Sequence, residues 1–192
     1  YDWRTAFLVL GELALLVVIP AALLLRPVPA TALPASLPAP APGLTARRLW
    51  TFWPFWAIAL THFACCAAHS GPIFHMVSHA IDQGVAALAA AGALGISGLT
   101  SIVGRVGTGM VADRVGAKPT LIVGLILQAL TIFLYVFARE AGTLYALAMV
   151  FGVAYGSVMP LYAVVTREYF GERAMGTAYG GVFFISCMGM GL

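Results

Sequence analysis

Residues 104–119 read GRVGTGMVADRVGAKP, and this stretch decides how the rest of the chain is interpreted. It lies between two long apolar segments and combines closely spaced glycines with an Asp-Arg pair. Gly109 lets one helix approach another closely, Asp113 ends a helix, and Gly116 permits the tight turn that follows. A short charged turn between apolar segments is expected at a membrane surface, where its basic residues suit the cytoplasmic side.

The composition around this stretch is that of a membrane protein. Of 192 residues, 61% are apolar and 9% are charged, and the mean hydropathy is +0.96. An average soluble domain has about 25% charged residues, whereas ten basic and seven acidic residues cannot cover a solvated surface here. A soluble globule and a disordered chain are excluded, and so is a nucleic-acid binder, because the basic residues form no run. The chain is expected to be an all-α polytopic membrane protein.

Six stretches are long and apolar enough to span a bilayer, which takes about 20 residues. Their length and their lack of two-residue alternation favour helices over barrel strands. The predicted segments are Thr5–Leu25, Leu49–Val77, Gly84–Val111, Pro119–Ala138, Gly142–Thr166 and Met175–Leu192. The chain begins without Met and ends inside an apolar run, so we expect a fragment of a longer protein.

The connection between the first two segments is rich in proline and alanine. Six of the eleven prolines fall in residues 27–48, which predicts an extended linker between two helical bundles. Basic residues favour the linker's side of the membrane: Arg26, Arg47, Arg48, Arg114, Lys118, Arg167 and Arg173 lie there, against Arg4 and Arg139 opposite. This bias places the linker and loops 112–118 and 167–174 in the cytoplasm of a multi-pass protein of the plasma (inner) membrane.

The pattern Gly109-x-x-x-Asp113-Arg114-x-Gly116-x-Lys118 resembles the signature loop of the major facilitator superfamily. In that family the loop recurs between helices 2 and 3 and between helices 8 and 9, within a bundle of twelve helices. The resemblance implies that the loop stabilises one of two alternating-access states. An unrelated cytoplasmic hairpin is the alternative interpretation.

If this loop is the second copy, the resemblance also implies which of the twelve family helices each predicted segment corresponds to. Residues 1–26 become helix 6, the last helix of an N-terminal bundle that is otherwise missing. Residues 27–48 become the cytoplasmic linker between bundles, and residues 49–192 become helices 7 to 11, with helix 12 missing. A first-copy assignment requires an unusually long linker between helices 1 and 2.

Arg105 is the first candidate for binding a substrate. It lies eight residues before Asp113, about 12 Å along a helix, and therefore inside the membrane, where an Arg must face a wet cavity or the bundle interior. Ser101 lies one turn before it on the same stripe. The surrounding sequence resembles helix 8 of monocarboxylate transporters and oxalate/formate antiporters, in which an Arg at this place binds the substrate carboxylate. The alternative is that Arg105 supports the signature loop, for example by pairing with Asp113.

Two further residues complete the candidate substrate-binding set. His69 is a candidate pore-lining or proton-carrying side chain in the second segment. Tyr155 lies in the fifth segment, within the glycine- and proline-containing stretch Gly152–Pro160, whose G-x-x-x-G spacing predicts close packing and a kink. We expect no metal, because His62 and His69 are about 10.5 Å apart along a helix, and no cofactor.

The sequence therefore predicts a secondary active transporter and not an enzyme. Small organic anions such as monocarboxylates are the expected substrates, carried by symport or antiport, with protons, the bilayer and the missing bundle as partners. A drug or sugar transporter of the same fold is the nearest alternative. A non-transporting sensor, or an intramembrane serine protease built on the G-x-S-G sequence at Gly95–Gly98, belongs to a different class.

Overall fold

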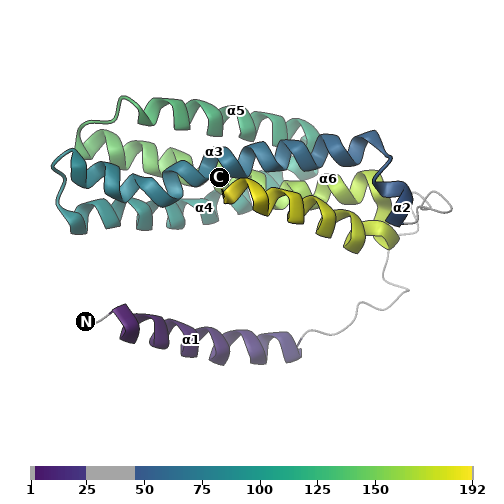
Figure 1. Cartoon of the computed structure of the whole chain (residues 1–192), viewed down its shortest axis with the longest axis horizontal. Helices are drawn as coiled ribbons and strands as arrows, with labels where there is room; N and C mark the ends of the chain where they lie inside the picture. The colour runs from purple at the N-terminus through teal and green to yellow at the C-terminus, as the bar shows by residue number, and fades with distance from the viewer. Residues whose placement is uncertain (1–2, 25–45, 192) are drawn as a thin grey trace. The chain divides into compact units, whose positions relative to one another are not determined.

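The computed structural model describes residues 3–24 and 46–191. Within these residues every regular element is a helix, which agrees with the expected all-α class (Figure 1). The helices are α1 (Trp3–Leu24), α2 (Ala46–Leu49), α3 (Trp53–Asp82), α4 (Ala87–Val115), α5 (Ala117–Tyr135) and α6 (Ala141–Met190). The chain divides into two compact units, Tyr1–Pro38 and Ala39–Leu192.

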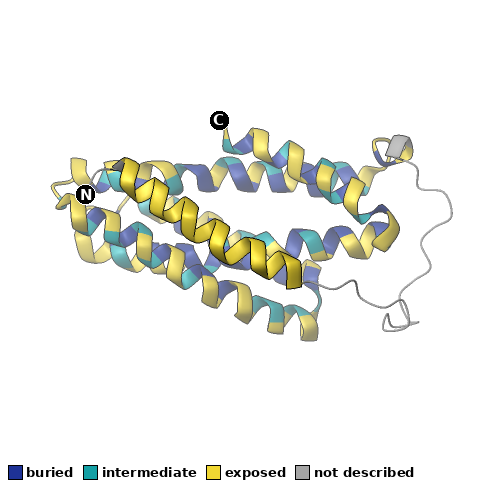
Figure 2. Cartoon of the chain, turned by 90° about the horizontal axis from the view of Figure 1, so that it is seen from below, coloured by how far each residue is buried: buried dark blue, intermediate teal, exposed yellow. Residues whose placement is uncertain are grey.

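The first unit contributes the single helix α1. Its 22 residues correspond to about 33 Å at 1.5 Å per residue, which matches a hydrocarbon core of about 30 Å. Every residue from 4 to 24 is exposed (Figure 2). An apolar helix without a buried stripe is suited to lipid or to the face of another helix rather than to a soluble surface.

The prediction of six spanning segments is wrong for the part of the chain that the structure describes. It contains five helices long and apolar enough to cross a membrane. The difference lies at the C-terminus, where the predicted segments Gly142–Thr166 and Met175–Leu192 are joined in the 50-residue helix α6. In place of the expected loop at 167–174, a sharp kink with non-helical φ and ψ angles at Gly171 separates the two helical parts of α6.

Gly171 is where α6 changes direction. A straight helix of 50 residues would be about 75 Å long, more than twice the thickness of the hydrocarbon core. Gly171 has a φ of 71° and a ψ of 171°, a combination open essentially only to glycine. We call residues 141–170 the first arm of α6 and residues 172–190 the second arm, which runs back along the bundle (Figure 1).

The first arm of α6 packs against α4 through backbone contacts that only glycine allows. A Cβ at Gly152 would overlap the Ser97 carbonyl, and one at Gly156 would overlap the Ser101 carbonyl. Reciprocally, a Cβ at Gly104 of α4 would overlap the Val153 carbonyl. The G-x-x-x-G spacing therefore does serve close helix packing, as expected for membrane bundles.

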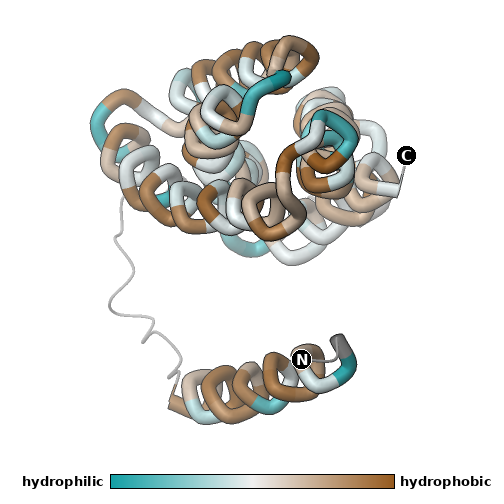
Figure 3. The backbone as a smooth tube through the Cα atoms, turned by 90° about the vertical axis from the view of Figure 1, so that its left-hand side faces the viewer, coloured by the Kyte–Doolittle hydropathy of each residue, from teal (hydrophilic) through white to brown (hydrophobic). Residues whose placement is uncertain are grey.

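The second unit has two clusters of buried apolar residues. One joins α3, α5 and both arms of α6, and includes Phe55, Tyr162 and Phe170. The other, built largely of alanines, joins α3, α4 and the first arm near the opposite end of the bundle. Hydrophobic residues recur along the long helices (Figure 3), and many of the large ones are exposed. Of the predicted linker, residues 27–45 lie outside the described residues, and residues 46–48 belong to α2.

Candidate functional site

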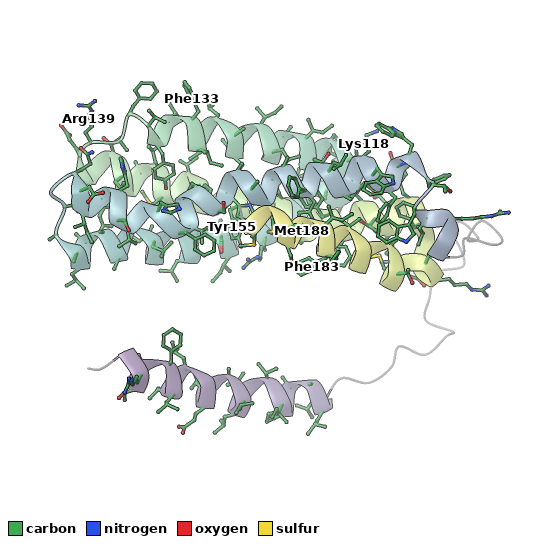
Figure 4. The ribbon with its side chains drawn as sticks, in the orientation of Figure 1. Lys118, Phe133, Arg139, Tyr155, Phe183 and Met188 are labelled. Atoms are coloured by element: carbon green, nitrogen blue, oxygen red, sulfur yellow. The ribbon has the colours of Figure 1, made fainter. Side chains whose placement is uncertain are left out.

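Two of the predicted substrate-binding residues meet between α3 and the first arm of α6. The imidazole of His69 lies edge-on to the Tyr155 ring, with 5.0 Å between centroids and an angle of 62°. His69 is only 1% exposed, and Tyr155 is half-buried and stacks on Phe151. Tyr155 lies in the middle part of the bundle (Figure 4). The contact therefore joins two polar side chains that come from two different membrane-spanning segments.

The same region contains Gln128 of α5, which the sequence analysis did not single out. Gln128 is 2% exposed, and its Nε2 donates to the backbone oxygen of Cys65 at 3.5 Å and to the Cys65 Sγ at 3.4 Å. The Cys65 Sγ is also 3.9 Å from Nδ1 of His69. Gln128 could have been predicted from the sequence as an interhelical contact, because it is the single amide in the apolar run from Leu121 to Leu134. An amide side chain in a bilayer needs a hydrogen-bond partner on another helix.

Ser101 and Arg105, one turn apart on α4, have different surroundings. Ser101 is 4% exposed, and its Oγ donates to the Gly98 carbonyl at 2.6 Å. Its backbone is covered by Gly156, so Ser101 belongs to the packed α4–α6 contact. Arg105 is exposed. Within residues 46–191 the ion pair that forms is Arg167–Glu172, so Arg105 does not pair with Asp113.

The residues of the signature loop lie at one end of the bundle, between α4 and α5. Gly116 has a φ of 100°, and its N–H donates to the Ala112 carbonyl at 2.8 Å, which forms the expected tight turn. Asp113 and Arg114 are exposed and Gly109 is half-buried. Lys118 Nζ donates to the Tyr169 hydroxyl at 3.5 Å, which links this loop to the turn of α6.

The described residues hold no group of three His, Cys, Asp or Glu side chains arranged to bind a metal ion. His79, at the far end of α3, has its Nε2 3.3 Å from the Ala138 carbonyl. His62 stacks on Tyr162, with 3.9 Å between ring centroids and an angle of 16°. Ser97, the serine of the G-x-S-G sequence, lies buried against Gly152.

Three pockets follow the seam between α3 and α5. Their volumes are about 480, 310 and 280 Å³. The largest shares Thr61 and Leu125 with the second, and Ile132 with the third, so together they form one groove. The lining is mostly apolar, and none of the three pockets is lined by Arg105, His69 or Tyr155. The groove is thus separate from the candidate substrate-binding residues.

The sequence is similar to known transport proteins along its whole length. The profile of the Major Facilitator Superfamily matches residues 1–192. The chain is 30% identical over 193 residues to Monocarboxylate transporter 13 of Bos taurus and to that of Rattus norvegicus, with 98% of this chain covered. It is 28% identical over 115 residues to the protein named Probable transporter MCH1 of Candida glabrata, with 52% of this chain and 24% of that protein covered.

The chain spans 44% of the length of the two mammalian relatives. The whole-length profile match agrees with the signature loop at residues 109–118 and with the bundle of long apolar helices around it. The chain belongs to the Major Facilitator Superfamily.

Proposed function

We propose that this chain is part of a secondary active transporter that carries small organic anions, with monocarboxylates first among them, across a plasma (inner) membrane. The observation that carries the proposal is the exposed Arg105 within the membrane-spanning helix α4. An arginine in the middle of a bilayer costs at least about 2.5 kcal/mol on insertion scales unless it faces water or a partner. A guanidinium fork matches a carboxylate bidentately.

The face of α4 that carries Arg105 has open space in front of it, which a solute or another helix could occupy. Gly98 and Gly109 lie seven and four residues from Arg105, so all three share one face of the helix. A Cβ added at either glycine would meet nothing within 4 Å. The names of the mammalian relatives agree with an anionic substrate. A drug or sugar transporter of the same family is the second candidate, and it would use the same open face without requiring the arginine.

The transport cycle would be alternating access, in which two bundles rock about a site near the bilayer midplane. Helices α3 to α6 form one bundle, and an N-terminal bundle in cis, to which α1 would belong as helix 6, forms the other. Gly109, Asp113, Arg114, Gly116 and Lys118 would stabilise one of the two states through the cytoplasmic loop, with protons as the coupled ion. In this proposal Ser101 acts through helix packing, whereas His69 and Tyr155 contact the solute.

Uptake by the full-length protein in proteoliposomes tests the proposal. Labelled lactate, pyruvate and formate are supplied to the wild type, Arg105→Lys, Arg105→Ala and the control Arg139→Ala, whose exposed side chain lies outside the helices. We expect Arg105→Ala to lose at least about 10-fold in uptake, since a charged hydrogen bond is worth about 1.5–3 kcal/mol. Arg105→Lys should retain part of the wild-type uptake, and Arg139→Ala should transport as the wild type does. Wild-type uptake by both Arg105 variants would refute the role of Arg105, and sugar or drug uptake alone would favour the second candidate.

A further inference from the structure

The imidazole of His62, the tenth residue of the 30-residue helix α3, is buried without a hydrogen bond to either ring nitrogen. Its exposed fraction is 1%, and neither Nδ1 nor Nε2 has a partner among the described residues. Leaving a buried polar group unsatisfied costs about 1–3 kcal/mol. Nearly all buried polar groups are bonded, so an exception of this kind requires a physical explanation.

The polar groups around His62 direct their hydrogens elsewhere. The Tyr162 hydroxyl, on the ring that stacks on the imidazole, donates to the Thr61 carbonyl at 3.3 Å. The Thr61 hydroxyl donates to the Ala57 carbonyl at 2.7 Å. Neither hydroxyl bonds a ring nitrogen of His62.

His62 lies between two aromatic rings of α6. We call the Tyr162 ring the floor of the site and the Phe183 ring its cover. Tyr162, which forms the floor, is fully buried. On another side lies Phe183 of the second arm of α6, with 6.3 Å between ring centroids and an angle of 57°. Phe183 is 50% exposed and lies in the middle part of the bundle (Figure 4).

Among the described residues, no carboxylate forms an ion pair or a hydrogen bond with His62. The titratable side chains of α3 nearest to His62 along the chain are Cys65, Cys66 and His69. Those of α6 include Tyr155, Tyr162, Tyr179 and Cys187, and its turn carries Arg167, Glu168, Glu172 and Arg173, of which Arg167 and Glu172 pair with each other. The acidic residue of α3 is Asp82 at its end, and residues 174–190 of α6 carry no charge. The charges of α4 and α5 are Arg105, Asp113, Arg114 and Lys118, none of which bonds the ring. An imidazolium would therefore be unpaired under a closed cover, and it would be stable only with water or an anion beside it.

We propose that His62 is a gated proton-binding site, with the Tyr162 ring as its floor and the Phe183 ring as its cover. When Phe183 swings away, a proton from the aqueous phase binds the lone pair of one ring nitrogen, and no other bond changes. The face of Tyr162 stabilises the resulting cation, and an anionic solute supplies the missing counter-charge. When the cover closes without an anion, the proton leaves again. The link between this proton and anion transport rests on the proposed function, whereas the site itself does not.

Chemical modification tests the cover independently of transport. The full-length protein in nanodiscs is treated with diethylpyrocarbonate, which carbethoxylates accessible neutral imidazoles, and each histidine peptide is quantified by mass spectrometry. In the wild type we expect His62 to react at least about 10-fold more slowly than the exposed His75, because a buried group reacts only through opening. Phe183→Ala should remove most of this difference, while Phe184→Ala, the exposed neighbour, should preserve it. Equal protection of His62 in the Phe183→Ala and Phe184→Ala variants would refute the cover.

Transport and spectroscopy test the proton. In proteoliposomes, His62→Gln should lose pH-driven anion accumulation by at least about 10-fold relative to the wild type, since the proton-binding group is removed. The control variant His75→Gln should accumulate anions as the wild type does. Accumulation by His62→Gln at the wild-type level would overturn the proposal. If the wild type carries none of the three anions, the proposed function fails. The site is then judged by ¹⁵N-histidine NMR of Phe183→Ala, where a His62 signal unchanged between pH 8 and pH 5 would overturn it.

Discussion

Gly156 of α6 lies against the backbone of Ser101 in α4 so closely that a Cβ at position 156 would overlap the Ser101 carbonyl. Gly152 repeats the contact one turn earlier, against Ser97. The small residues thus bring a candidate helix of the transport pathway, the first arm of α6, directly onto the helix that carries Arg105. The approach depends on the absence of side chains at these two positions.

Gly156→Leu should therefore separate α4 from α6 and destabilise the bundle. Overpacking a close contact costs about 1–3 kcal/mol, and we expect a lower midpoint of thermal unfolding, measured on the detergent-solubilised full-length protein by fluorescence-detected size exclusion. Gly95→Ala is the matched control, because a Cβ there meets nothing within 4 Å and alanine favours a helix by about 1 kcal/mol. Equal midpoints for Gly156→Leu and the wild type would show that the contact is not tight.

Gly171→Ala should destabilise the reversal of α6. The φ of 71° and ψ of 171° at this position lie in a region that L side chains rarely adopt, and the strain costs about 1–3 kcal/mol. The control is Gly176→Ala in the second arm, where a Cβ meets nothing within 4 Å and no positive φ is required. The same thermal measurement applies. A midpoint for Gly171→Ala equal to or above that of Gly176→Ala would contradict the geometry of the turn.

Gln128→Ala should weaken the link between α5 and α3. Its amide hydrogen bonds to Cys65 are long, at 3.5 and 3.4 Å, and interhelical hydrogen bonds in membranes average about 0.6 kcal/mol. A double-mutant cycle with Cys65→Ala, followed by reversible unfolding in mixed micelles, should give a coupling free energy of about that size. Gln83→Ala, at the exposed end of α3, should change stability little. Additivity of Gln128→Ala and Cys65→Ala would mean that the two side chains do not interact energetically.

Lys118 and Arg139 should react from opposite sides of the membrane. Lys118 is in the first turn of α5 and Arg139 follows its end, so they lie at opposite ends of the bundle (Figure 4). The basic bias predicts that Lys118 is cytoplasmic. Full-length variants with Lys118→Cys or Arg139→Cys, in a background without the three native cysteines, are treated in intact cells with a membrane-impermeant maleimide. Only Arg139→Cys should be labelled, and Lys118→Cys should require cell lysis. Labelling of Lys118→Cys in intact cells would invert the proposed topology.

Much of this protein could be predicted from local sequence. Composition alone determined that it spans a membrane, because so few charges cannot cover a soluble surface. The glycines and charges of residues 104–119 determined the family, and the turn at Gly116 follows from a local requirement for positive φ. The close packing at Gly152 and Gly156 was likewise visible as a spacing, since residues four apart lie on one face of a helix.

Only the tertiary structure decided the rest, because it depends on which segments face one another. It joined the last two predicted segments into α6 through Gly171. It buried Ser101 against Gly156 while leaving Arg105, one turn away, exposed, although both share a stripe in the sequence. Burial of a side chain and the partners of a polar atom are set by residues far away along the chain. For this reason the pairing of Gln128 with Cys65 and the unpartnered imidazole of His62 could not be read from sequence spacing.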